Sequence, residues 1–331
     1  MDHLLKKSVV SRRSFTYGYY VSPGDKFALE HPALIFIHGW PDSAYLWSEI
    51  SKGLSDLPNK LIFIDCLGYA STDKPQQTSF YSFQGQADDV VDILRNENVK
   101  SAIVVGHDWG SVLAQRVFLH HRELFVGVVL VNAGYMVPTD QRFDLEAVNN
   151  FTKETIGHPQ FAYWDFFANE DAASVIDPRL ERLWQVLHGN ADDWLKRNFC
   201  NPGAMRKFLE GNEDVPLKPY AQDPKWRDHW IEQFKQDGMD STFFMYRAMV
   251  TGVQSRSDFD LVKGTLSIDV PLLFIFCSKD TLCPASMMSQ AKQENLVPKL
   301  TEVEVDAAHW SPMEKPHELV RHIKMFMTDT F

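Results

Sequence analysis

The sequence predicts an α/β fold with a mostly parallel, buried sheet, flanking helices and an inserted helical lid. Short runs of Val, Ile, Leu and Phe alternate with longer amphipathic stretches, and continuous apolar strands are typical of a sheet covered on both faces. The alternation stops between about 138 and 250, where the chain is rich in Trp, Phe and Tyr and has no comparable strand runs. We therefore expect a core at 1–137 and 251–331, interrupted by a helical cap at 138–250.

The predicted strands are short and purely apolar, and the predicted crossover helices repeat apolar residues at helical spacing. The strands are expected at residues 34–37, 61–64, 103–105, 128–131 and 272–276, with a further short strand at 303–306. The helices are expected at roughly 82–95 and 109–121. Because the strand at 272–276 resumes the core pattern after the aromatic stretch, an inserted lid is favoured over an independent second domain.

Bulk composition excludes several functional classes. The net charge of -11 and the lack of long basic runs argue against a nucleic-acid partner. No apolar run approaches the roughly 20 residues that a membrane span requires. The four cysteines are too far apart for a CxxC pair and lack histidines at zinc-site spacing, so we expect reduced thiols, no metal and no cofactor. A cytoplasmic enzyme is the resulting expectation, and the sequence does not specify its oligomeric state.

A candidate nucleophile lies directly after the strand at 103–105. Gly106-His107-Asp108-Trp109-Gly110 is a Gly-x-nucleophile-x-Gly turn, whose glycines allow a sharp bend from strand to helix. An ordinary helix cap is the alternative, since Asp is favoured at that position. With a reference pKa of about 3.9, an aspartate is already a carboxylate at neutral pH, so it attacks saturated carbon and forms an ester. The turn therefore disfavours an ordinary esterase.

A candidate base and its orienting acid follow later strands. His309 comes after the strand at 303–306, and a histidine can accept a proton from water near neutral pH. Asp280 follows the strand at 272–276 and would hold the tautomer of His309. Each residue alone is more often structural. The order Asp108, Asp280, His309 is the nucleophile, acid, base order of α/β-hydrolases, and one known alternative acid position is filled here by Asn132.

A candidate oxyanion loop follows the first core strand. His38-Gly39-Trp40-Pro41 comes immediately after residues 34–37. A loop at this position can direct the Trp40 N–H, together with the Trp109 N–H, at the carbonyl oxygen of an Asp108 ester. In isolation the Gly-Trp-Pro sequence is only a turn, and its distance before the nucleophile makes it specific.

Taken together, these motifs resemble the epoxide hydrolase branch of the α/β-hydrolase family, over essentially the whole chain. That branch combines an HGxP loop, a GHDWG nucleophile turn and a late Asp and His. Residues 65–75 resemble its D-x-x-G-x-G-x-S-D-K-P stretch, except that Ala70 replaces a usual glycine, which affects loop geometry. The resemblance implies an α/β-hydrolase fold and an epoxide hydrolase that acts through a covalent ester on Asp108.

The resemblance also assigns roles to the lid. Phe161-Ala162-Tyr163-Trp164 and Phe244-Met245-Tyr246-Arg247 are similar to the two lid-tyrosine motifs of the family. Their phenols, with a reference pKa of about 10, would bind and protonate the epoxide oxygen. An aromatic residue packed in the lid is the alternative for each. The resemblance places His38, Pro41 and Trp164 in the substrate pocket, and the aromatic lining suggests an apolar or aromatic epoxide, with water as second substrate.

Two other functions compete with this interpretation. A dehalogenase uses the same aspartyl ester, and Trp109 could hold a departing halide. However, haloalkane dehalogenases typically carry Asn where Trp40 stands, and haloacetate dehalogenases carry Arg where Trp109 stands. A non-catalytic receptor on the same fold would be expected to have lost part of the triad, which is complete here. The particular epoxide, and a role in detoxification or in natural-product biosynthesis, are not specified.

Overall fold

The computed structural model describes residues 1–24 and 31–331 and divides the chain into two compact units. The first unit consists of Met1–Pro75, Phe80–Asp140 and Gln254–Phe331, and the second of Gln76–Ser79 and Gln141–Val253. The helical cap was expected at 138–250, and the long segment of the second unit is Gln141–Val253. Within the described residues, no helix has both the length and the apolar character that crossing a membrane requires.

The first unit is built on one eight-stranded sheet, with the strand order β1-β2-β4-β3-β5-β6-β7-β8. The strands are β1 (Leu5–Val10), β2 (Thr16–Val21), β3 (Ala33–Ile37), β4 (Leu61–Ile64), β5 (Ala102–His107), β6 (Phe125–Val131), β7 (Leu272–Cys277) and β8 (Leu300–Val305). The pairs β1/β2 and β2/β4 are antiparallel, and every other pair is parallel. The predicted α/β fold class is therefore confirmed.

The central strands form the core because they are apolar on both faces. Every residue of β3, β4 and β5 is buried. Full burial of an Ile or Phe side chain contributes roughly 1.5–3 kcal/mol, so these short runs are strongly held. Strands β1 and β2 were not predicted, because β1 is almost entirely exposed and β2 contains polar residues and a glycine instead of a continuous apolar run.

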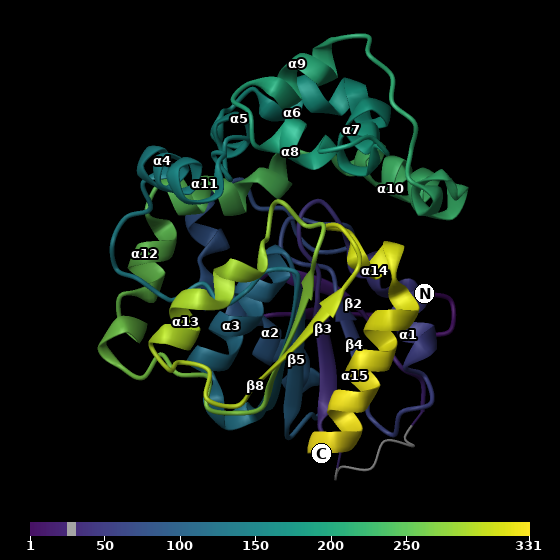
Figure 1. Ribbon diagram of the computed structural model, residues 1–331. Coiled ribbons are helices and arrows are strands. Elements are labelled where there is room, and N and C mark those ends of the chain that lie inside the picture. Colours follow the sequence, from purple (N-terminus) through teal and green to yellow (C-terminus); the bar gives the residue numbers. More distant parts are fainter. Residues whose placement is uncertain (25–30) are drawn as a thin grey trace. The chain divides into compact units, whose positions relative to one another are not determined.

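Helices cover both faces of the sheet (Figure 1). Helices α2 (Phe83–Asn96) and α3 (Trp109–His120) pack together on one face, close to their expected limits. On the opposite face, α1 (Ser48–Gly53) packs against α15 (Pro316–Thr330), whose apolar residues recur at helical spacing. The unit also contains α13 (Ser289–Gln293), α14 (Ser311–Glu314) and most of α12 (Val253–Asp258).

The second unit is helical. Its helices are α4 (Leu145–Ile156), α5 (Trp164–Ala168), α6 (Ala172–Ile176), α7 (Leu180–His188), α8 (Trp194–Phe199), α9 (Ala204–Glu210), α10 (Pro224–Asp237) and α11 (Phe244–Val250). Among its described residues, strand pairing is limited to one isolated bridge between Gly189 and Leu217. Aromatic residues supply much of its interior, including Trp184, Phe199, Trp230 and Phe243.

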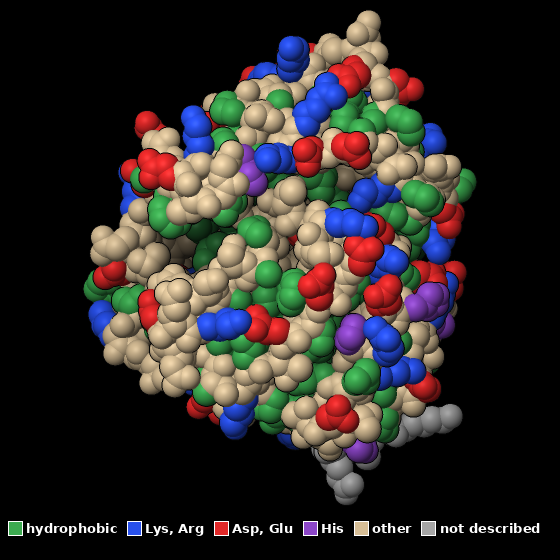
Figure 2. All heavy atoms as spheres, in the orientation of Figure 1, with side chains coloured by type: hydrophobic (Ala, Val, Ile, Leu, Met, Phe, Trp, Pro, Cys, Tyr) green, Lys and Arg blue, Asp and Glu red, His purple; other side chains and the backbone are tan. Residues whose placement is uncertain are grey.

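Charged side chains are mixed on the surface. On the face drawn in Figure 2, acidic and basic groups lie interspersed, without a broad area of basic side chains. The chain as a whole has a net charge of -11.

Candidate active site

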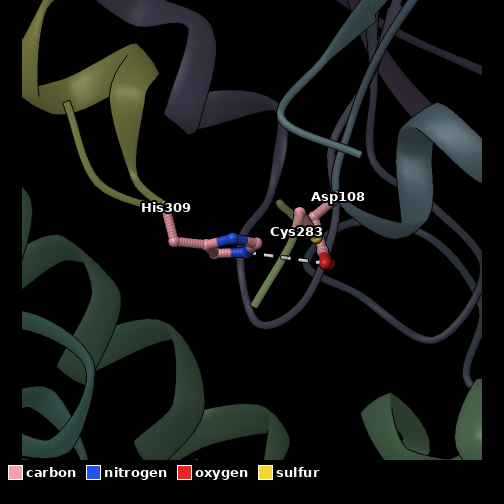
Figure 3. A group of neighbouring side chains, drawn as sticks. All are labelled: Asp108, Cys283 and His309. Atoms are coloured by element: carbon pink, nitrogen blue, oxygen red, sulfur yellow. Dashed lines mark ion pairs between the residues drawn. The ribbon is translucent and has the colours of Figure 1, made fainter. Parts of the chain in front are cut away.

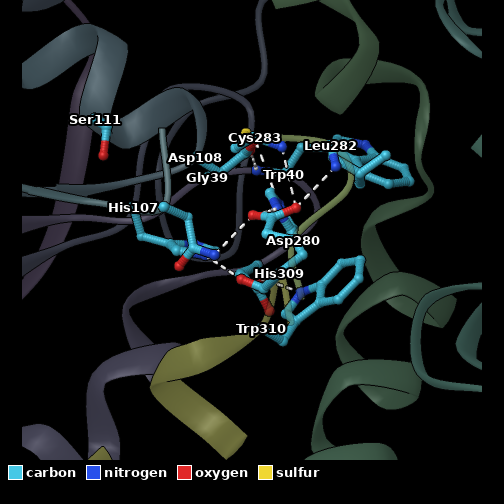
Figure 4. A network of polar contacts seen from close by, with 12 residues as sticks. Gly39, Trp40, His107, Asp108, Ser111, Asp280, Leu282, Cys283, His309 and Trp310 are labelled. Atoms are coloured by element: carbon cyan, nitrogen blue, oxygen red, sulfur yellow. Dashed lines mark hydrogen bonds and ion pairs between the residues drawn. The ribbon is translucent and has the colours of Figure 1, made fainter. Parts of the chain in front are cut away.

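The carboxyl ends of five parallel strands bring the predicted residues of the first unit together. The loop at 38–41 follows β3, Asp108 follows β5, Asn132 follows β6, Asp280 lies beyond β7 and His309 lies beyond β8. Carboxyl ends of parallel strands meet at one edge of a sheet, where ligands of α/β proteins usually bind. Figure 4 shows Asp108, Asp280 and His309 converging from separate segments of the chain.

Asp108 occupies a strained turn between β5 and α3. Its φ of 55° and ψ of -124° lie in a region that side-chain-bearing residues rarely adopt. Gly106 and Gly110 permit the bend, because a Cβ on Gly106 would overlap the Gly110 carbonyl and one on Gly110 would overlap the Ile37 carbonyl. The Asp108 side chain is 14% exposed and makes no cap hydrogen bond to its own helix. The turn therefore presents the carboxylate instead of using it as a helix cap.

The carboxylate of Asp108 is held by backbone donors. The Trp40 N–H donates to Oδ1 at 2.9 Å, and the Trp109 N–H also hydrogen-bonds to the group. Burial alone raises the pKa of Asp108, but His309, His107 and the Trp109 N–H outweigh burial and hold that pKa below its ordinary value. Asp108 is therefore ionised at neutral pH, with one oxygen already in contact with a predicted oxyanion donor.

The side chain of His38 contacts backbone groups of the loop after β3 and of the chain after β4. The His38 Nδ1 lies 2.8 Å from the Gly39 carbonyl, and its Nε2 accepts from the Cys66 N–H at 3.0 Å. Burial lowers the pKa of His38 to about 4, so the ring is neutral. Gly39 leaves room for the nucleophile, since a Cβ there would overlap Asp108 Oδ1. His38 and Pro41, both predicted to line the substrate pocket, are buried, and Pro41 lies in the loop itself.

His309 lies between Asp280 and Asp108, the two residues with which it was expected to act. The His309 Nδ1 lies 2.9 Å from Asp280 Oδ2, and its Nε2 lies 3.5 Å from Asp108 Oδ2. Burial opposes a charged imidazole, but Asp280 and Asp108 outweigh burial and raise the pKa of His309 well above its ordinary value. With Nδ1 engaged by Asp280, the Nε2 atom is the one that faces the nucleophile.

Asn132 is a further member of this network, which the sequence identified only as an alternative acid position. Its Nδ2 donates to Asp280 Oδ2 at 2.7 Å, and its Oδ1 accepts from the Ser311 hydroxyl at 2.6 Å. The N–H groups of Leu282 and Cys283 donate to Asp280 Oδ1 at 2.9 and 3.1 Å. Burial raises the pKa of Asp280, but His309 and these donors outweigh it and hold the pKa below its ordinary value. Asp280 therefore remains a carboxylate although fully buried.

Two neighbours of His309 were not anticipated from sequence. The Nε2 of His107 lies 2.8 Å from the His309 carbonyl, which ties the nucleophile turn to the base loop. The Cys283 thiol is within hydrogen-bonding reach of the His309 side chain, and burial raises the pKa of that thiol to about 12. Neither residue lies near His309 along the chain, so their contacts arise only from the fold.

The second unit holds both predicted lid tyrosines in an aromatic cluster. Tyr163 lies at the start of α5 and Tyr246 lies in α11, and their ring centroids are 5.9 Å apart. Trp164 contacts Tyr246 edge-on at 5.4 Å, and Phe167 contacts it at 5.0 Å. Both tyrosines are buried. The structure thus brings the two tyrosine motifs together within this unit, although 83 residues separate them in the sequence numbering.

Comparisons with known proteins identify related sequences. A family model described as the alpha/beta hydrolase fold matches residues 32–316. The chain is 26% identical over 304 residues to epoxide hydrolase A of Mycobacterium tuberculosis, with 90% of each chain covered. It is 23% identical over 290 residues to bifunctional epoxide hydrolase 2 of Rattus norvegicus, covering 87% of this chain and 50% of that protein. The chain thus spans about half the length of this relative and of its Sus scrofa counterpart.

Solved structures give the same fold. An epoxide hydrolase from an endophytic Streptomyces matches with a TM-score of 0.79 at 22% identity, over 99% of this chain and 96% of that one. Potato (Solanum tuberosum) epoxide hydrolase I matches with a TM-score of 0.78 at 21% identity, over 98% and 99% of the two chains. At these identities, the structural likeness establishes the fold.

Proposed function

The chain belongs to the alpha/beta hydrolase fold family, and we propose that it is an epoxide hydrolase that forms a covalent ester on Asp108. The observation that carries this proposal is an ionised aspartate in the nucleophile turn, 3.5 Å from the imidazole of His309. Its curated relatives named above are epoxide hydrolases, which supports the same reaction class.

In the first half-reaction, the carboxylate attacks a ring carbon of the epoxide and the carbon–oxygen bond of the ring breaks. Oδ2 is the better candidate for the attacking atom, because Oδ1 is bound by the Trp40 N–H. The released alkoxide needs a proton, and we assign its delivery to Tyr163 and Tyr246. A phenol suits this task because it is neutral at physiological pH and can donate to the ring oxygen before the bond breaks.

In the second half-reaction, water hydrolyses the ester. His309 Nε2 removes a proton from water while Asp280 stabilises the resulting imidazolium at Nδ1. The hydroxide adds to the ester carbonyl, and negative charge develops on Oδ1. The backbone N–H groups of Trp40 and Trp109 already point at this carboxylate, so they need little rearrangement to stabilise the oxyanion. Collapse expels the alkoxide, which takes the proton held by His309 and leaves as the diol. The proton left on the Asp108 carboxyl returns through solvent to the tyrosinate, which restores both groups.

We extend the proposal to the substrate and the compartment. The aromatic cluster around Tyr163, Trp164 and Tyr246 favours an apolar or aromatic epoxide. The four cysteines are free and buried, which is consistent with a reducing compartment such as the cytoplasm.

Water labelled with heavy oxygen tests the covalent mechanism. During a single turnover with an aryl epoxide, label should enter Asp108, because water attacks the ester carbonyl and not the substrate carbon. Proteolysis and mass spectrometry of the peptide containing Asp108 would detect it. Label appearing directly in the diol on the first turnover would mean that Asp108 acts as a general base for water. Halide release from haloalkanes without diol formation from epoxides would replace the proposal with a dehalogenase.

A further inference from the structure

Cys283 completes a set of three possible metal ligands with the nucleophile and the base. One ligand atom each from Asp108, Cys283 and His309 lie within 4.8 Å of one another. In Figure 3 the edge of the His309 ring faces Asp108, and Cys283 lies beside Asp108. The proposed reaction uses the carboxylate and the imidazole but gives the thiol no task. We propose that these three side chains form an inhibitory Zn²⁺ site, in which the ion occupies the nucleophile and the base together.

The ligand chemistry matches Zn²⁺. A sulfur, an imidazole nitrogen and a carboxylate oxygen are its usual protein ligands, at about 2.3, 2.0 and 2.1 Å. In a tetrahedral site these bond lengths separate the nitrogen and the oxygen by about 3.4 Å. In the structure, the distance between His309 Nε2 and Asp108 Oδ2 is 3.5 Å. These two atoms therefore already have the spacing of zinc ligands, and the Cys283 sulfur lies within 4.8 Å of a ligand atom of each residue.

The surrounding hydrogen bonds also suit a metal site. A zinc-bound histidine usually donates its other ring N–H to a carboxylate, and Asp280 occupies that position at His309 Nδ1. The Trp40 N–H engages Oδ1 of Asp108 and leaves Oδ2 as the ligand atom. Three protein ligands would leave a fourth position for water. The Asp108 side chain is 14% exposed, which provides contact with solvent.

Binding is balanced by the loss of two protons. The Cys283 thiol becomes a thiolate as the zinc–sulfur bond forms, and His309, which its raised pKa keeps protonated in the free chain, gives up its Nε2 proton. Both protons pass to solvent. No electron transfer is involved. With its carboxylate coordinated, Asp108 is a weaker nucleophile, and with Nε2 coordinated, His309 cannot accept a proton from water. The ion therefore acts as an inhibitor and not as a cofactor.

Cobalt titration of the reduced full-length chain tests the site without any turnover. Co²⁺ bound to a thiolate gives a near-ultraviolet charge-transfer absorption, which Co²⁺ on surface carboxylates and histidines lacks. We expect this absorption to saturate at one equivalent and to disappear when Zn²⁺ is added. Cys283→Ser and Cys283→Ala should both abolish it. Cys200→Ser is the matched control, because Cys200 is a buried cysteine of the second unit that forms no disulfide, and the variant should retain the absorption.

Two further variants separate a built site from chance coordination. His309→Gln should weaken Co²⁺ binding by at least about tenfold, and Asp280→Asn, which alters only the partner of the ligand, by about 10- to 100-fold. A thiolate absorption that persists in Cys283→Ser, or one absent from the native chain, would overturn the proposal.

The inhibition itself is measured with the epoxide substrate and so rests on the proposed function. Zn²⁺ should inhibit the native chain, a chelator should restore its rate, and half-inhibition of Cys283→Ser should require at least about tenfold more Zn²⁺, relative to its own metal-free rate. Equal inhibition of both proteins would contradict the site. If the chain opens no epoxide, the cobalt result still decides whether the metal site exists.

Discussion

The two units hold their candidate catalytic groups in different ways. In the first unit, each group lies just beyond a strand and has defined hydrogen-bond partners. Asp280, for example, accepts hydrogen bonds from Asn132, Leu282 and Cys283 and also contacts His309. In the second unit, Tyr163 and Tyr246 lie on or beside short helices and make several aromatic ring contacts. Polar networks fix the orientation of a group, whereas aromatic packing fixes mainly its position. Substitutions in the two regions should therefore have different kinetic signatures.

The largest effect is expected from Asp108→Ala. Removing the only group that bonds to substrate should lower turnover by about 10⁴-fold or more. Neither Trp40 nor Trp109 can replace it, since both contribute backbone donors. Steady-state diol formation measures the effect, and thermal unfolding verifies that the fold is retained. Turnover within tenfold of the native rate would remove the covalent mechanism.

His309→Gln should separate the two half-reactions. Asp108 is ionised without help from a base, so attack on the epoxide should continue, whereas ester hydrolysis should slow by about 10²–10⁴-fold. The alkyl-enzyme should accumulate, and intact-protein mass spectrometry should find an added mass of one substrate. Digestion would locate this mass on the peptide containing Asp108. An unmodified protein after prolonged mixing with a good substrate would argue that His309 is needed earlier.

Changing Tyr163 and Tyr246 together to Phe tests the second unit. The rings keep most of their packing, but the hydroxyl donors are lost, so alkylation by an epoxide should slow by about 10²–10⁴-fold. Stopped-flow measurement of alkylation, compared with any halide displacement from a haloalkane, distinguishes the two roles. An equal loss of both reactions would mean that the tyrosines only shape the unit.

The pH dependence should show a smaller, graded effect. Burial lowers the pKa of His309, but Asp280 and Asp108 raise it well above its usual value. Esterification removes the charge of Asp108, so we expect the pKa of His309 to be lower in the intermediate than in the free chain. Below this lowered pKa the imidazole is protonated, and ester hydrolysis should slow roughly tenfold for each unit of decreasing pH. Single-turnover rates of hydrolysis provide the measurement.

Two comparisons make the pH experiment specific. The titration of His309 in the free chain, followed by NMR, should have a midpoint above that of the ester-hydrolysis rate, and coincident midpoints would contradict the charge argument. Asp42 is the neighbour most able to confuse the profile, because burial raises its pKa to about 7 and it accepts from the Trp310 indole at 3.1 Å. Asp42→Asn should therefore leave the midpoint of the ester-hydrolysis rate unchanged.

Sequence patterns predicted the parts of the molecule that depend on local chain geometry. The apolar runs located the five strands β3–β7, the sequence at 303–306 located β8 in part, and the glycine spacing located the turn at Asp108. Strand ends then brought His309 and Asp280 into contact, as their order along the chain predicted. Strands β1 and β2 lacked this signal because neither is a continuous apolar run.

The remaining details depend on contacts between distant segments. Asn132 bonds Asp280 across 148 residues, and His107 bonds the His309 carbonyl across 202 residues, which no local pattern specifies. Cys283 meets His309 only because the loop after β7 folds back around Asp280. The resemblance placed His38 in the substrate pocket, but its burial and its two backbone partners were not specified by the sequence. The sequence therefore did not indicate in which direction a side chain in a loop points or which distant residue it contacts.

The backbone of Asp108 also bears on how this protein can change over evolutionary time. At φ 55° and ψ -124°, any residue with a Cβ carries about 1–3 kcal/mol of strain that glycine avoids. Asp108→Gly should therefore have an unfolding free energy about 1–2 kcal/mol higher than that of Asp108→Ala. It should accordingly unfold at a higher temperature, although both variants are inactive. A mutation of Asp108 to glycine would therefore stabilise the fold, and only selection for activity would eliminate it. A descendant that had lost its catalytic role should relax here first, keeping the fold and gaining glycine at the nucleophile position.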